Sequence, residues 1–274
     1  IPMVIYGVSG NQSIAKLFIA GFIPGIIIAG GLMTVNYYLC RKKGYTGSGH
    51  SWSMSTLGKA LKEGFWSLMA PVVILGGIYS GFFTPTEAAV VAIFYTLFVG
   101  IFIHRELKWG GCAKSLEACT WLTGRVLLIM FTARAFGRLL VQYRIPEIIA
   151  NALLAMTTNV YIILALVIIF LIFVGMFMET LATIMILTPV LLPVMVKLGV
   201  DPIHFGIILV CCCEIGFETP PLGENLFIAS GIANTSIEDI SLKAIPFSVV
   251  EISAVFLIAY VPALSLWLPT LLGY

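Results

Sequence analysis

Two short strings in this sequence have the residue types and spacing to bind an ion. The pattern Gly-Phe-x-Thr-Pro occurs at residues 81–85 and again at 216–220, each time inside an apolar stretch. In both, Gly can end one helix, Thr can cap the next, and Pro suits its first turn. Glu87 follows Thr84 at capping-box spacing, which predicts a self-satisfied structural turn. The second string has no such acid.

The second break, residues 216–223, therefore leaves polar groups free for chemistry. The carbonyls that end the first helix can bind Na⁺, and the positive end of the second helix can face an anion. The alternative is a kink packed against neighbouring helices.

Glu179 is an isolated charge within residues 175–180, between two apolar arms. We interpret this segment as the tip of a helical hairpin. A carboxylate inside a membrane is costly and marks a functional position. The alternatives are a cap for the helix expected to open at Leu181 or a group at the membrane interface.

Arg134 and Arg138 are four positions apart, so they share one face of a helix. Together they could hold a carboxylate, or they could extend to lipid headgroups or a cytoplasmic cavity. No pair among the three histidines has metal-ligand spacing. We interpret the cysteines, including consecutive 211–213, as packing residues.

The composition indicates where these groups must lie. Of 274 residues, 60% are hydrophobic and 10% are charged, with a mean hydropathy of +1.06 and a net charge of +2. The charged share is far below the roughly 25% of average proteins. This excludes a soluble enzyme, a nucleic-acid binder and a disordered chain, and predicts roughly seven to nine membrane segments of about 20 residues.

The charge pattern and the segment lengths predict the topology. The loop 41–64 is rich in Lys and Arg and is expected to be cytoplasmic, as is 104–119. Several apolar pieces are too short to cross comfortably, which is typical of re-entrant hairpins and broken helices at transporter binding sites. Ile1 is not an initiator Met, and the first residues do not have the pattern of a signal peptide. We therefore expect the chain to begin inside a longer protein.

Several short sequence strings occur in the same order as in a known protein family. The chain resembles the large membrane subunit of the tripartite ATP-independent periplasmic (TRAP) transporters, the DctM-like permeases, over nearly its whole length. It is similar to their C-terminal two-thirds, so the N-terminal inverted repeat and first hairpin would be missing. The matching strings lie at 16–21, 24–25, 71–79, 81–88, 175–179, 199–206, 216–223 and 225–227.

The resemblance implies an all-α, polytopic, elevator-type transporter of the bacterial inner membrane, with one inverted repeat and part of the other. Residues 1–118 would be scaffold and arm, 119–233 the transport portion, and 234–274 the terminal scaffold helix. Na⁺ would drive uptake of an organic acid: a C4-dicarboxylate, a sialic-acid-like compound or another carboxylate. A periplasmic binding protein would deliver it, and a small membrane subunit would support the scaffold. Neither enzymatic activity nor nucleic-acid binding is expected.

The resemblance also implies site residues. Backbone carbonyls at the tip and the break would hold Na⁺, and side chains beside them would contact the substrate. Glu179 stands where the family usually has Asp, and Arg134 and Arg138 where it is mostly apolar, so the pocket is expected to differ from its relatives'. The expected ion ligands are Gly175, Met178, Gly216, Thr219 and Gly223, and the expected substrate contacts are Glu179, Thr180, Thr183 and Arg134, with the Thr219 hydroxyl.

Three alternatives remain open at this point. A related ion-coupled anion permease would work without a binding protein. A passive channel would be indifferent to a Na⁺ gradient. An intramembrane enzyme is disfavoured because the sequence has no nucleophile–base pair and no paired Asp motif.

Overall fold

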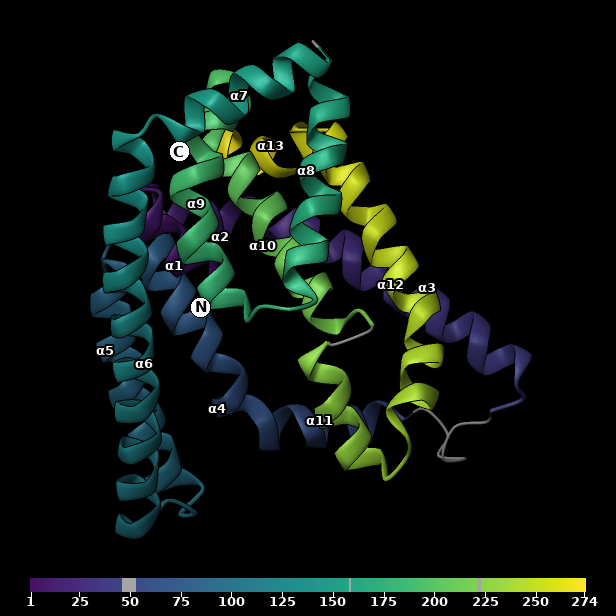
Figure 1. Cartoon of the computed structure of the whole chain (residues 1–274). Coiled ribbons are helices and arrows are strands. Elements are labelled where there is room, and N and C mark those ends of the chain that lie inside the picture. Colours follow the sequence, from purple (N-terminus) through teal and green to yellow (C-terminus); the bar gives the residue numbers. More distant parts are fainter. Residues whose placement is uncertain (46–52, 158, 221–222) are drawn as a thin grey trace. The chain divides into compact units, whose positions relative to one another are not determined.

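A computed structural model describes residues 1–45, 53–157, 159–220 and 223–274 (Figure 1). Residues 46–52, which include His50, and Pro221 with Leu222 lie outside the described part. The described residues form helices and no strand, which confirms the all-α prediction. The helices are α1 (Pro2–Ser9), α2 (Ile14–Ala20), α3 (Phe22–Lys42), α4 (Met54–Tyr79), α5 (Pro85–Phe98), the π-helix η1 (Val99–Ile103), α6 (Trp109–Gln142), α7 (Ile145–Met156), α8 (Val160–Gly175), α9 (Thr180–Lys197), α10 (Pro202–Glu218), α11 (Glu224–Ala233), α12 (Ile237–Tyr260) and α13 (Ala263–Leu271).

The described helices include six that are long and apolar enough to cross a bilayer, and in all of these but Thr180–Lys197 most side chains are not buried inside the protein. A helix that is apolar all round and not covered by protein needs lipid around it. The protein is therefore a polytopic membrane protein. The six spans are Ile14–Lys42, Met54–Tyr79, Pro85–Ile103, Gly110–Leu140, Thr180–Lys197 and Ile237–Tyr260.

The chain divides into two compact units, one formed by Ile1–Lys43 with Val126–Tyr274 and the other by Gly44–Arg125. Helix α6 crosses the boundary at Arg125 without a break. The expected division into scaffold and transport portions stays a prediction.

The smaller unit is built on the hairpin of α4 and α5. Its turn contains the predicted capping box: the Thr84 N–H donates to the Glu87 carboxylate at 2.8 Å, and the Glu87 N–H donates to the Thr84 hydroxyl at 3.3 Å. Gly81 has φ +76°, which favours glycine at that point of the turn. Helix α4 begins at Met54, well inside the stretch 41–64 that the sequence predicted to be a loop. Its first turns are rich in Ala, Leu, Lys and Glu, which have high helix propensity and outweigh the interspersed glycines.

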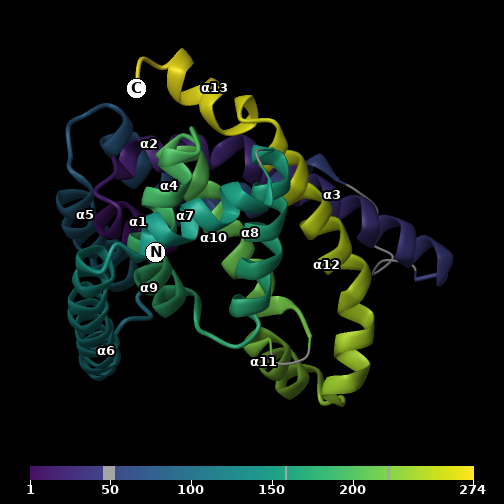
Figure 2. The same cartoon turned by 45° about the horizontal axis from the view of Figure 1, so that its top comes forward.

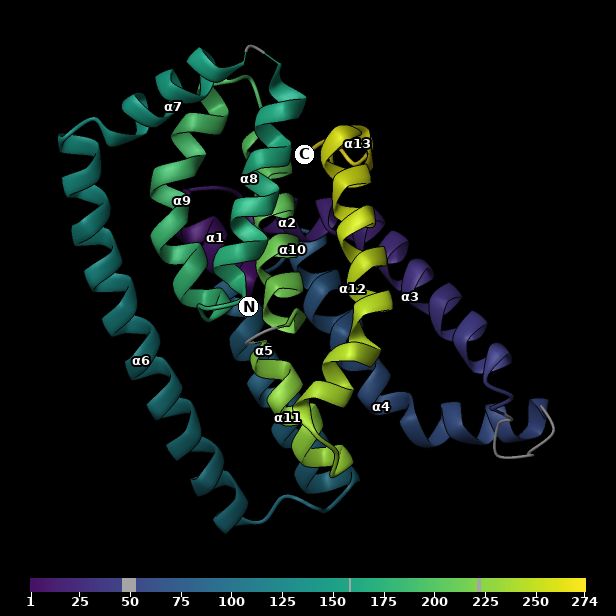
Figure 3. The ribbon, with the colours of Figure 1, turned by 45° about the vertical axis from the view of Figure 1, so that its right-hand side comes forward.

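The larger unit is organised around α10. This helix has fully buried side chains on all sides, among them Phe205, Ile207 and Ile208, as expected for a helix that is apolar all round. Its start follows the predicted Asp-Pro signal, because the Asp201 carboxylate accepts from the Ile203 N–H at 2.8 Å. Helix α8 packs chiefly against α10, whereas α9 packs against α10 and α1 alike and also against α7; α8 and α9 contact each other little (Figures 1 and 3).

Two further contacts hold the surroundings of α10 in place. Tyr6 of α1 donates its hydroxyl to the Pro202 carbonyl at 2.6 Å, and its ring lies against Gly206, where a side chain would not fit. Helix α12 packs against both α10 and α3, and crosses α3 where Gly31 faces Val250 (Figure 2). The core of this unit therefore holds the ends of α8, α9 and α10 in a fixed arrangement.

Candidate functional site

The predicted hairpin tip is an irregular turn between two helices of the larger unit. Helix α8 ends at Gly175 and α9 begins at Thr180. The turn is closed by backbone hydrogen bonds from Phe177 and Met178 to the Val174 carbonyl, both at 3.0 Å.

The break after α10 differs from its prediction. Gly216 lies inside α10, which continues to Glu218, and Thr219 follows in an extended conformation. Thr219 does not cap α11, as the sequence predicted, because α11 begins only at Glu224. Instead, its N–H donates to the Gly216 carbonyl at 3.0 Å and its hydroxyl donates to the Ile215 carbonyl, so both satisfy the end of α10.

Gly175 and Gly216 bring the tip and the break together. A Cβ on Gly216 would lie 2.7 Å from the Cα and the carbonyl carbon of Gly175 and 2.7 Å from the Ile172 carbonyl oxygen. A Cβ on Gly175 would lie 3.2 Å from the Gly216 Cα. The two helices thus touch backbone to backbone, which only glycine permits.

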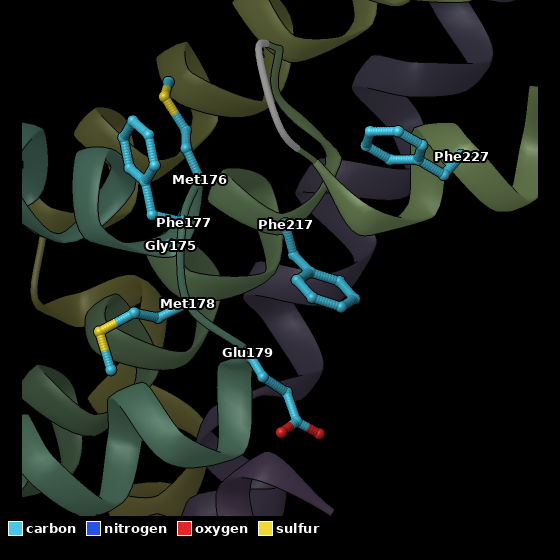
Figure 4. Close-up of a pocket in the computed structure, with 7 residues that line it drawn as sticks. All are labelled: Gly175, Met176, Phe177, Met178, Glu179, Phe217 and Phe227. Carbon is cyan, nitrogen blue, oxygen red and sulfur yellow. The ribbon is translucent and has the colours of Figure 1, made fainter. Parts of the chain in front are cut away.

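A cavity of about 270 Å³ lies at this contact (Figure 4). Phe217 and Phe227 form its wall on the side of the break, and Glu179 is its acidic group. Figure 4 shows the Glu179 carboxylate and the Phe217 ring on the side of the tip away from the Met178 side chain. The tip contributes the remaining lining residues, Gly175, Met176, Phe177 and Met178.

Glu179 occupies the position before α9, but its side chain makes no capping hydrogen bond to that helix. Its backbone carbonyl instead accepts from the Thr183 N–H and the Thr183 hydroxyl, both at 3.0 Å. The carboxylate is therefore not committed to capping α9, and it lines the cavity.

Two other features place oxygen atoms at the tip and at the break. The Thr180 hydroxyl is buried and has no hydrogen-bond partner in the part of the chain that the structure describes. At the break, a Cβ on Gly223 would lie 2.8 Å from the Phe217 carbonyl oxygen and 3.0 Å from that of Thr219. A buried hydroxyl without a partner and a group of carbonyls that a side chain would cover both suit a hard cation.

Arg134 does not join these residues. It lines a second cavity, together with Arg138, and that cavity shares no lining residue with the one at the tip. Of the expected residues, Gly175, Met178 and Glu179 line the cavity at the tip, Gly216 contacts Gly175, and Gly223 lies beside the Thr219 carbonyl. Arg134 lies outside this group.

Glu251 is a carboxylate that the sequence reasoning missed. It lies in the α12 span with 7% of its surface exposed. The charged group that interacts with it electrostatically is Glu218 on α10. The same reasoning that singled out Glu179, an isolated carboxylate in an apolar run, would have found it.

Comparison with known proteins identifies the family. Residues 1–264 match the tripartite ATP-independent periplasmic transporter, DctM component. The chain belongs to this family. The family is a transporter permease, as the resemblance implied.

Three relatives cover nearly the whole chain. An isethionate TRAP transporter permease of Oleidesulfovibrio alaskensis is 43% identical over 97% of the chain and 42% of the relative. A C4-dicarboxylate TRAP large permease of Pseudomonas aeruginosa is 39% identical, and a sialic acid TRAP large permease of Vibrio cholerae is 38% identical, each over 100% of the chain and 64% of the relative. The chain thus spans 42% to 64% of the length of these relatives.

Gly216→Ala tests the contact between tip and break. The added Cβ would lie 2.7 Å from Gly175 backbone atoms, so α8 and α10 must separate. We expect a loss of about 1–3 kcal/mol of unfolding free energy, measured as a lower unfolding temperature in detergent. Gly231→Ala is the matched control, because nothing lies within 4 Å of its Cβ position. Equal unfolding temperatures for the two variants would contradict the contact.

Proposed function

We propose that this chain carries the ion- and substrate-binding part of a Na⁺-coupled permease that takes up an organic acid across a bacterial inner membrane. The observation that carries the proposal is the glycine contact, which joins an irregular tip and a broken helix at one small cavity. Irregular backbone at membrane depth is tolerated only inside protein or beside a water-filled cavity, and in transporters it marks the binding site.

The oxygen atoms around the contact support Na⁺ as the coupling ion. The Thr180 hydroxyl and the carbonyls of Phe217, Thr219 and Gly223 would hold it, with those of Gly175 and Met178 on the tip. Uncharged carbonyl and hydroxyl oxygens suit a monovalent cation that must also leave again. Bound Na⁺ supplies positive charge beside the cavity, and the chain's own residues set the position of that charge.

The substrate is proposed to be an organic acid, since the relatives' names refer to isethionate, C4-dicarboxylates and sialic acid. The positive end of α11 faces the break and favours an anionic group there. Glu179 can only accept hydrogen bonds when ionised, so it would select a hydroxyl or another donor on the same molecule.

The packing around α10 supports an elevator movement. Because α8 packs chiefly on α10, and α9 packs on α10 as well as on α1, the tip, the break and this helix can shift together as one body. A periplasmic binding protein would deliver the substrate and a small membrane subunit would complete the transporter. The alternative is an ion-coupled anion permease that works without a binding protein.

Reconstitution tests the proposal as a whole. Proteoliposomes containing the permease and its small subunit are given radiolabelled isethionate, succinate or sialic acid, with and without a binding protein specific for each. We expect uptake of one acid that needs both an inward Na⁺ gradient and its binding protein. Uptake without the binding protein would favour the anion permease that works alone. Uptake that does not depend on Na⁺ would show that transport is not coupled to Na⁺.

Thr180→Val removes the buried hydroxyl and keeps the shape of the side chain. We expect the Na⁺ concentration that half-maximally stabilises the purified permease to rise about tenfold, because one lost oxygen contact costs about 1–1.5 kcal/mol. Thermal unfolding in NaCl against choline chloride measures it. Thr270→Val, on α13, is the control and should leave the Na⁺ response unchanged, since its hydroxyl bonds within its own helix. A wild-type response in Thr180→Val would remove that hydroxyl from the ion site.

Glu179→Gln removes the charge at the cavity with little change of shape. We expect Na⁺-driven uptake to fall at least about tenfold through loss of a charged acceptor, while Na⁺-dependent thermal stabilisation persists. Glu147→Gln, on α7, changes the same chemical group away from the cavity and should transport normally. Wild-type uptake by Glu179→Gln would show that the carboxylate has no role in transport.

A further inference from the structure

Helix α6 carries two arginines for which the described residues provide no partner. Arg134 and Arg138 lie within the span Gly110–Leu140, and neither guanidinium has a hydrogen bond or an ion pair with any residue that the structure describes. A cationic side chain in a membrane span is costly and normally faces a partner or a polar cavity. The two arginines therefore need an anion.

Both arginines line one large cavity of the larger unit. It has a volume of about 1120 Å³ and lies between α1, α6 and α9. Arg134 and Arg138 are its charged lining residues, and none of the residues that line it is acidic. Ser9, Asn11 and Gln142 add hydrogen-bonding groups. The cavity thus has two positive charges that nothing in its lining neutralises.

Small residues on α6 direct the arginines toward this space. Ala133 is buried, and a Cβ on Gly137 would lie 3.1 Å from the Pro189 ring, so α6 touches α9 at Gly137. Arg134 and Arg138 follow these two residues by one position each, about 100° further round the helix. They therefore lie at the edge of the contact, where the cavity opens.

The depth of the arginines fits a lipid phosphate. Arg138 lies two residues before Leu140, the end of the span, which is about 3 Å at about 1.5 Å per residue. Long arginine side chains at this depth reach the headgroup region. The apolar lining residues Met130, Phe131 and Leu139 offer contacts for acyl chains.

We propose that this cavity binds an anionic phospholipid, with its phosphate on Arg134 and Arg138. The planar guanidinium groups match phosphate oxygens bidentately. A basic pocket between membrane helices is the setting in which such headgroups bind. The volume exceeds the roughly 300–1,000 Å³ of small-molecule sites, and the cavity is separate from the tip, so the site is distinct from the proposed substrate site.

The test compares lipids that share the same acyl chains. The purified permease with its small subunit is titrated with dioleoylphosphatidylglycerol or dioleoylphosphatidylcholine, and thermal unfolding and native mass spectrometry report binding. We expect saturable stabilisation by the phosphatidylglycerol and little by the phosphatidylcholine. Arg134→Gln/Arg138→Gln should weaken phosphatidylglycerol binding about 30-fold, since each basic group contributes about 1 kcal/mol near a lipid surface.

Two further variants control for net charge and folding. Lys108→Gln/Lys114→Gln removes the same charge from the start of the α6 region, outside the cavity, and should bind as wild type. Arg134→Lys/Arg138→Lys keeps the charge but loses the planar guanidinium group. Its affinity for phosphatidylglycerol should therefore lie between those of the wild type and the double glutamine variant. It remains informative if the double glutamine variant does not fold.

Three outcomes would overturn the proposal. Equal stabilisation by the two lipids would show that binding does not require a negative charge. Undiminished phosphatidylglycerol binding in the arginine variants would show that the lipid does not bind at Arg134 and Arg138. The third is stabilisation by succinate that depends on the arginines while phosphatidylglycerol has no effect, which would assign the cavity to the transported acid.

Discussion

The structure depends on one constraint: peptide groups that leave a helix inside a membrane must be covered by protein or serve a ligand. Here the coverage comes from two glycines. Gly175 and Gly216 let α8 lie directly on α10, so the irregular tip after α8 is placed against the end of α10 and is not left facing lipid. The same contact keeps other side chains out, which leaves room for the small cavity beside it. A single close approach thus brings the tip, the break and the cavity together.

Helix α10 turns this local contact into a larger assembly. Most of its side chains are apolar and buried, and α8, α9, α12 and α1 all pack on it. Polar interactions then fix which residues meet: Asp201 begins the helix, Tyr6 bonds to the carbonyl of Pro202, and Thr219 completes the last turn. The result is a compact unit in which the irregular tip and the end of α10 lie together.

The sequence predicted the parts of this arrangement that follow from local rules. The capping box at Thr84 and Glu87, the start of α10 and the tip between α8 and α9 all rest on neighbouring residues, and the structure confirms them. The predicted end of α10 was wrong. Glycine often ends a helix, but Gly216 lies inside α10 and contacts Gly175, a residue distant in the sequence. Arg134 and Glu179 were expected in one site, but their separation depends on how α6 lies against α9, which periodicity does not specify. Glu251 was missed although the sequence contained its signal.

The unbroken course of α6 through Arg125 has a mechanical consequence. An α-helix resists bending and twisting far more than a loop does, and α6 has neither a proline nor a described irregular turn at that boundary. The residues on either side of Arg125 thus belong to one continuous helix, with no loop between them. Within the larger unit, Gly137 of α6 lies against Pro189 of α9, so a movement of α9 would reach α6 directly beside the arginine pair.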